Sequence, residues 1–122
     1  MELRLAKRLE CRPATSSDLA AFYGKPVTRT VRAWVLETEG RIIAVGGIAY
    51  HRGRPWDLFS DCSPEIRKHP VATFKAVKAV LGSVLRDLPA VALADDSHVN
   101  SERFLKMLGL KPLGKRTYRW EP

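Results

Sequence analysis

The chain has 122 residues, of which 45% are hydrophobic and 28% are charged. This composition is typical of one globular domain with a single core. No run of about 18 apolar residues occurs, and residues 1–10 lack the apolar centre of a signal peptide, which argues against membrane insertion and export.

The formal net charge is +8, which would suit nucleic acid, an acidic protein surface or a polyphosphate cofactor. Residues 1–61 hold ten basic against seven acidic residues, and residues 62–122 hold eleven against six, so the excess is spread over the chain. No basic tract is interleaved with aromatic residues as on a single-strand binding surface, which argues against a nucleic-acid partner.

Cys11 and Cys62 are the only cysteines, too few for a disulfide framework or a cysteine-only zinc site. The three histidines, His51, His69 and His98, are scattered and have no acidic residues at ligand spacing. We therefore expect a reduced, cytoplasmic protein without a metal site.

The N-terminal part predicts a strand, a short helix and a loop. Apolar and charged residues alternate over Leu3–Cys11, as in a strand. Thr15 and Asp18 have the spacing of a capping box, which predicts a helix over Ser16–Tyr23. Gly24 would end this helix and begin a loop.

Three strands should follow as a meander, over Val31–Glu37, Arg41–Tyr50 and Pro55–Asp61. The second is nearly all apolar, which is typical of a central strand covered on both faces. Its glycine pair, Gly46 and Gly47, predicts a bulge or a close approach of another group to the backbone.

A long helix should begin at Pro70, whose missing N–H is tolerated in the first turn. Apolar residues recur at a spacing of three and four over Val71–Leu88, which predicts one amphipathic helix. Arg67, Lys68 and His69 precede it, and free N–H groups at a helix N-terminus favour an anion. The same residues also suit a solvated connection, so both interpretations remain open.

The C-terminal part predicts a short buried strand over Ala90–Ala94, parallel to the third meander strand because a helix connects the two. A short helix capped by Asn100 or Ser101 should end at Gly109. Leu110–Trp120 then supplies one or two closing strands. The expected fold is one α/β domain, a mixed sheet of six to seven strands with helices on both faces.

This order and two motifs resemble the GCN5-related N-acetyltransferase (GNAT) superfamily. The family's cofactor loop reads Arg or Gln, two residues, Gly, one residue, Gly or Ala; Arg67 and Ala72 match it, and Pro70 replaces its first glycine. The stretch Asn100–Gly109 resembles the family's Asn followed by an aromatic-containing helix. Phe104 stands where many members have a tyrosine as general acid.

The resemblance covers nearly the whole chain, since Arg12–Leu19 also resembles the family's first strand-to-helix segment. The compact form, with almost nothing between the first helix and Val31, resembles small acetyltransferase-like proteins of phages and prophages. In larger members a second helix in that region helps to recognise the acceptor. Its reduction implies an acceptor site that is open or completed by a partner.

The resemblance implies acetyl-CoA as the cofactor. Its pantetheine arm would lie between the parallel strands as an added strand would, with its pyrophosphate on the basic loop. Because Pro70 cannot donate, the loss of one donor to a charged oxygen would cost about 1.5–3 kcal/mol. The implied cofactor contacts are Phe59, Ser60, Arg67, Lys68, His69, Val71, Ala72, Asn100 and Phe104.

Acyl transfer to an amine needs a base and a donor to the developing oxyanion. Asp57 or Asp61 could act as the base, and we favour Asp57 because Trp56 could help to desolvate it. Each carboxylate also suits a solvated strand residue or a helix cap. The backbone N–H of Phe59 or Ser60 is the candidate oxyanion donor.

The leaving thiolate also needs a proton, which Phe104 cannot supply. Ser101, His98, Tyr118 or water could replace it. A thiol with a pKa near 8.5 leaves without a strong acid, so Phe104 does not exclude catalysis.

Two functions follow. The first is an acetyl-CoA-dependent N-acetyltransferase acting on a primary amine of a protein or small molecule, favoured by Arg67, Ala72 and Asn100. The second is a non-catalytic phage protein of the same fold, either a virion component or an inhibitor of a host factor, favoured by Pro70 and Phe104. A basic nucleic-acid-binding module is a third, weaker interpretation.

The acceptor and the oligomeric state stay open. Tyr118 and Trp120 could complete the sheet or contact a second subunit of a homodimer.

Overall fold

The computed structural model describes residues 2–6, 9–50, 52, 56–83, 90–93, 101–114 and 117–120. The strands are β1 (Leu3–Ala6), β2 (Leu9–Pro13), β3 (Val31–Thr38), β4 (Arg41–Ala49), β5 (Trp56–Cys62), β6 (Ala90–Leu93), β7 (Lys111–Gly114) and β8 (Thr117–Trp120). The helices are α1 (Ser16–Tyr23), the 3₁₀ helix η1 (Pro64–Lys68), α2 (Pro70–Ser83) and α3 (Ser101–Met107).

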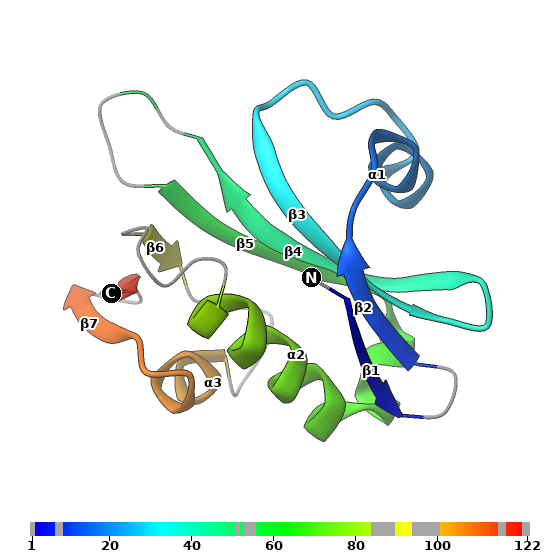
Figure 1. The fold of residues 1–122 in the computed structure, drawn as a ribbon. Helices are drawn as coiled ribbons and strands as arrows, with labels where there is room; N and C mark the ends of the chain where they lie inside the picture. Colours follow the sequence, from blue (N-terminus) through cyan, green and yellow to red (C-terminus); the bar gives the residue numbers. More distant parts are fainter. Residues whose placement is uncertain are drawn as a thin grey trace.

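The strands form one mixed sheet in the order β1-β2-β3-β4-β5-β6-β8-β7 (Figure 1). Strands β5 and β6 are parallel, and every other pair of neighbours is antiparallel. The predicted class and the parallel crossover are therefore confirmed. The described residues hold eight strands rather than six to seven, and no described helix is long and apolar enough to cross a membrane.

The additional strand lies at the N-terminus, where the prediction of a single strand was wrong. Residues 3–6 and 9–13 are two antiparallel strands, with Leu3 opposite Cys11. A strand and a hairpin of two short strands show the same alternation of apolar and charged residues. The pattern alone therefore does not reveal that the chain reverses.

Helix α1 has the predicted bounds because its ends are set by local chemistry. The Asp18 N–H donates to the Thr15 hydroxyl at 3.1 Å, and the Thr15 N–H donates to the Asp18 carboxylate at 2.8 Å. Gly24 ends the helix with a left-handed φ of 74°. Arg12 fixes this corner to the sheet by bonding Asp18 at 2.7 Å and Glu37 at 2.8 Å.

The glycine pair of β4 has the predicted close approach. A Cβ at Gly47 would collide with the backbone carbonyl oxygen of Arg32 on β3, whereas one at Gly46 would lie 3.4 Å from the Phe59 oxygen. The irregularity of the β3–β4 pairing lies elsewhere, between Leu36 and Glu37.

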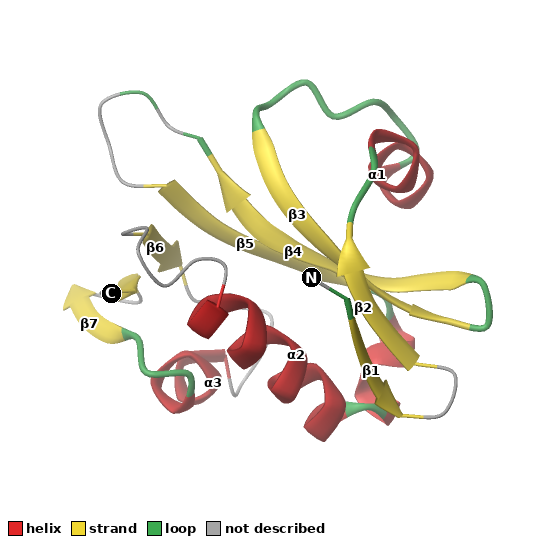
Figure 2. Cartoon of the chain, viewed as in Figure 1, coloured by secondary structure: helices red, strands yellow, loops and turns green. Residues whose placement is uncertain are grey.

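Each face of the sheet has its own core. Helix α1 covers one face, and α2 and α3 cover the other (Figure 2). Leu19 of α1 packs with Ala33, Val35 and Val45, whereas Trp34 and Leu36 face the other core. The core on the α2 and α3 face consists of Leu9, Cys11, Trp34, Leu36, Ile43, Ile48, Ala76, Val80, Leu81, Ala90, Ala92, Leu108, Leu110 and Tyr118.

The C-terminal elements follow the prediction. Helix α2 begins at Pro70 and is described to Ser83, so its expected extension to Leu88 lies outside the described residues. Helix α3 precedes Gly109, whose φ is 96°. Strand β8 lies between β6 and β7, so Tyr118 and Trp120 belong to an inner strand and β7 forms the edge of the sheet.

Candidate functional site

Strands β5 and β6 pair over a very short distance. Their described ladder contains Trp56 opposite Ala90 and Asp57 opposite Val91. Beyond these pairs β5 continues along β4 to Cys62, and β6 continues along β8 to Leu93. The edge of β5 beyond Asp57 therefore has no described strand beside it, at the place where the pantetheine arm was expected.

The register of β5 shows which backbone groups face this open edge. The Ser63 N–H donates to the Ile43 carbonyl of β4 at 2.9 Å, and the Phe59 oxygen lies close to Gly46 of β4. Successive residues of a strand direct their N–H and C=O groups to opposite edges. Phe59 therefore faces β4, and Ser60 and Cys62 face the open edge. Of the two candidate oxyanion donors, the register favours Ser60.

The basic loop is a 3₁₀ helix rather than an irregular connection. The His69 N–H donates to the Ile66 carbonyl at 3.0 Å, so this expected phosphate donor is already used inside the loop. The His69 carbonyl accepts from the Thr73 N–H at 2.9 Å and the Thr73 hydroxyl at 2.6 Å, which makes His69 the cap of α2. Val71 and Ala72 lie in the first turn of α2, where N–H groups have no intrahelical acceptor.

The charge around this loop is positive. Glu65 accepts from the Arg41 guanidinium at 2.7 Å, which neutralises the one acidic residue of η1. Arg67 and Lys68 are exposed. From residue 66 to residue 83 the sequence carries four basic residues and no acidic one. The end of α2 next to the open strand edge therefore attracts anions.

The two candidate bases, Asp57 and Asp61, lie two residues before and after Phe59, so all three side chains share one face of β5. Phe59 packs against the α1 core, so this is the α1 face. Asp57 pairs with Arg29 at 3.5 Å. Trp56 packs against the opposite core, so the expected desolvation of Asp57 by Trp56 is wrong. Neighbouring residues of a strand point to opposite faces, so the Trp56 side chain is directed away from that of Asp57.

Asp61 has a structural partner. It accepts a hydrogen bond of 2.7 Å from the hydroxyl of Tyr23, the last residue of α1. Burial and this bond raise the pKa of the Tyr23 phenol well above its ordinary value. Asp61 therefore holds α1 against β5, whereas Asp57 pairs with an exposed side chain, that of Arg29.

The remaining candidates are spread over α3 and its surroundings. Phe104 is half-buried and packs edge-on against Phe74 of α2, with 6.0 Å between the ring centroids. Ser101 is the first residue of α3. Tyr118 is buried in the core on the α2 and α3 face. Asn100 and His98 lie outside the described residues.

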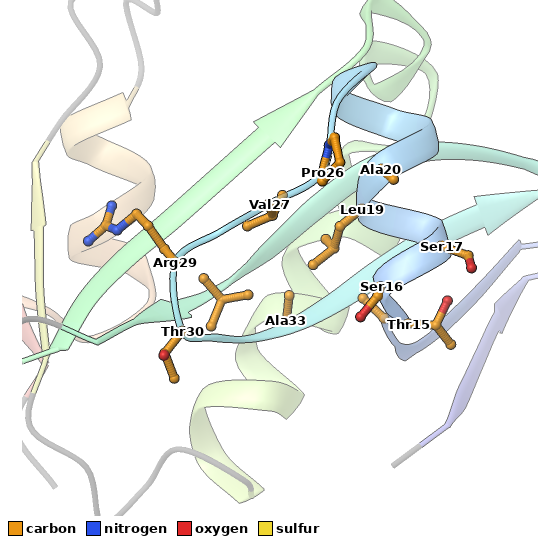
Figure 3. A pocket seen from close by; sticks show the side chains of 12 residues that line it. Thr15, Ser16, Ser17, Leu19, Ala20, Pro26, Val27, Arg29, Thr30 and Ala33 are labelled. Carbon is orange, nitrogen blue, oxygen red and sulfur yellow. The ribbon is translucent and has the colours of Figure 1, made fainter.

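The sequence did not predict a groove that runs between α1, the loop 24–30 and β3 (Figure 3). Its volume is about 520 Å³. Arg29 lies at the end of the groove away from α1, with its guanidinium pointing away from the helix. The apolar Pro26 and Val27 inside a polar loop are the sequence signal that could have indicated the groove.

Among the described residues no cluster of metal-ligating side chains is present.

A mixed sheet whose parallel pair opens next to a basic helix end has the architecture expected for the GNAT fold. No family model matches the sequence, and no curated protein matches it. The comparison with solved structures does show this fold. A GNAT-family acetyltransferase from Bordetella pertussis superposes with a TM-score of 0.69 at 14% identity, over 98% of this chain and 96% of that chain.

Two other similar structures are acetyltransferases that are named after their acceptors. The ribosomal-protein-S5-alanine acetyltransferase from Vibrio fischeri superposes with a TM-score of 0.67 at 12% identity, and both chains are covered completely. A spermidine/spermine N-acetyltransferase from Vibrio cholerae superposes with a TM-score of 0.63 at 12% identity, over 91% of this chain and 82% of that chain. The chain thus has the fold of the GNAT acetyltransferases.

Proposed function

We propose that the protein is an acetyl-CoA-dependent N-acetyltransferase that acts on a primary amine. The observation that carries the proposal is the open edge of β5, where Ser60 directs its backbone groups away from β4, next to the basic end of α2. An extended chain with amide groups can bond to such an edge as an added strand does. The pantetheine arm of acetyl-CoA is a chain of this kind.

The residues fit the cofactor in part. Ser60 would hold the pantetheine arm, and Val71 and Ala72 would donate to the pyrophosphate. Arg67 and Lys68 would add charge. Pro70 removes one donor and the His69 N–H is used within η1, so we expect weaker binding than a glycine loop gives. Acetyl-CoA supplies the activated acetyl group.

The chain's own groups would then act on the amine. Asp57 would take the proton from the acceptor ammonium, because it lies at the last rung of the β5–β6 ladder with its carboxylate partly exposed. The Ser60 N–H would donate to the oxygen on which negative charge develops. With Phe104 packed on Phe74, water is the simplest proton source for the leaving thiolate.

A non-catalytic phage protein of the same fold is the second candidate. Pro70 and the used His69 N–H favour it, because both reduce the number of phosphate donors. In either case we propose a cytoplasmic location, since the exposed Cys62 thiol stays reduced there.

The test is calorimetric titration with acetyl-CoA. Ser60→Pro removes the N–H that faces the open edge without removing a β4–β5 bond, and Ser60→Ala is its control. Arg67→Glu is compared with Lys106→Glu, an exposed charge reversal on α3. We expect Ser60→Pro and Arg67→Glu to bind at least tenfold more weakly, while both controls bind as the parent does. No binding at high micromolar acetyl-CoA would exclude the proposal.

A further inference from the structure

The groove beside α1 has the composition of a site for a small apolar group. Its volume of about 520 Å³ lies within the range of small-molecule sites. Apolar side chains of Leu19, Val27 and Val31 line it, together with hydroxyl groups of α1 and the loop. Arg29 is the one charged residue among those that line it, and no carboxylate is present there.

The groove leads to the candidate base. Arg29 lines it and pairs with Asp57, with 3.5 Å between the guanidinium and carboxylate atoms. Val31 of β3 is opposite Ala49 of β4, which is opposite Asp57 of β5. These three residues therefore share a face, and two strand spacings of about 4.8 Å separate Val31 from Asp57. The ion pair stands between the groove and the open edge of β5.

The ion pair itself is accessible. The side chain of Arg29 is 57% exposed and that of Asp57 is 38% exposed. Solvent weakens such an ion pair. A ligand with one negative and one positive group can therefore replace it, with its anion on the Arg29 guanidinium and its cation on the Asp57 carboxylate. The complementary ligand carries an ammonium group and a carboxylate group on neighbouring atoms. An α-amino acid has this arrangement.

We propose that the acceptor is a free α-amino acid with an apolar side chain, which rests on the proposed acetyltransferase function. Its carboxylate binds Arg29, its ammonium group binds Asp57, and its side chain occupies the groove. A polyamine fits poorly because the groove offers no carboxylate and carries a cation at its end.

The reaction is balanced without a further reagent. Asp57 takes one proton from the ammonium group, and the neutral nitrogen attacks the thioester carbonyl carbon of acetyl-CoA. The C–N bond forms as the C–S bond breaks. The nitrogen loses its second proton to water as the amide forms, and the leaving thiolate takes a proton from water, so these two transfers cancel. Asp57 returns the first proton to solvent. The products are an N-acetyl amino acid and coenzyme A.

The first measurement is binding of L-leucine to the protein without cofactor, by calorimetry. L-Leucinamide keeps the side chain and the amine but lacks the carboxylate, and we expect it to bind at least tenfold more weakly. Arg29→Gln should weaken leucine binding by a similar factor. Arg32→Gln is the matched control, because Arg32 lies three residues away and its guanidinium sits over Trp34 on the other face. The Arg32→Gln variant should bind leucine with the affinity of the parent protein.

The second measurement is release of free thiol from acetyl-CoA with leucine, leucinamide or spermidine as the acceptor. Leucine should be acetylated fastest. Transfer to spermidine or leucinamide at the rate of leucine, or equal leucine binding by Arg29→Gln and the parent, would overturn the inference and leave the acetyltransferase proposal intact. Absence of acetyl-CoA binding would overturn the proposed function, and with it the acceptor role of leucine.

Discussion

Replacing Gly47 by alanine should destabilise the protein strongly, because the backbone of β3 leaves no room for a Cβ at this position of β4. The new Cβ would collide with the Arg32 carbonyl oxygen and would lie 2.7 Å from the Ala33 Cα. Both are backbone atoms inside a ladder, so no side-chain rotation relieves the contact. The strands must separate locally.

The cost of Gly47→Ala can be estimated from this separation. Losing two ladder hydrogen bonds costs about 1 kcal/mol each, and overpacking adds about 1–3 kcal/mol, so we expect a loss of about 3–5 kcal/mol. For a domain of this size the melting temperature should fall by roughly 10–25 °C.

Thermal and urea unfolding followed by circular dichroism measure this loss, with Gly46→Ala as the control. A Cβ at Gly46 would lie 3.4 Å from its nearest neighbour, the Phe59 oxygen, so we expect a change of about 0.5 kcal/mol or less. Equal stability of the two variants would contradict this expectation, because only the Cβ at position 47 would meet backbone atoms of β3.

Two further predictions concern pH. The Arg12 guanidinium holds the pKa of Asp18 well below its ordinary value, so the pair stabilises the fold above about pH 4 and this contribution is lost as the pH falls further. Arg12→Gln should lower the unfolding free energy by about 1–3 kcal/mol at pH 7, and urea unfolding at pH 3 should show a smaller difference. The raised pKa of Tyr23 gives a pH dependence of stability in the opposite direction. Its bond to Asp61 stabilises the fold below about pH 10, and this contribution is lost as the pH rises above that value. Tyr23→Phe should cost about 0.5–1.5 kcal/mol at pH 7 and should lack this alkaline loss; a parent and variant that lose stability in parallel above pH 10 would contradict the assignment.

The sequence predicted best those features that local chemistry determines. Thr15, Asp18 and Gly24 fix the ends of α1 through hydrogen bonds and a backbone angle within ten residues of one another. The start of α2 at Pro70 is equally local. The crossover from β5 to β6 followed from the connection between them, because parallel neighbours need one.

Features that depend on pairing between distant residues could not be predicted in this way. Whether Phe59 or Ser60 faces the open edge depends on the register of β5 with β4, and a shift by one residue would exchange them. The pairs Tyr23–Asp61 and Arg29–Asp57 join segments more than 25 residues apart. No residue pattern in the sequence indicated these pairs, although they determine the surroundings of both candidate bases.

The sequence matches no family model although the chain has the GNAT fold, and a proposed site made of backbone groups at the edge of β5 is compatible with such divergence. Contacts to an extended arm at a strand edge use backbone N–H and C=O groups, which every residue except proline provides. Such a site is preserved when the register is preserved, whatever side chains occupy β5. The chain departs from the family where a particular residue type is needed, at Pro70 in the loop and at Phe104 on α3. Under the proposed acetyltransferase function we expect the selectivity for the acceptor to depend on side chains at the mouth of the groove, where Arg29 lines the groove and pairs with Asp57 of β5.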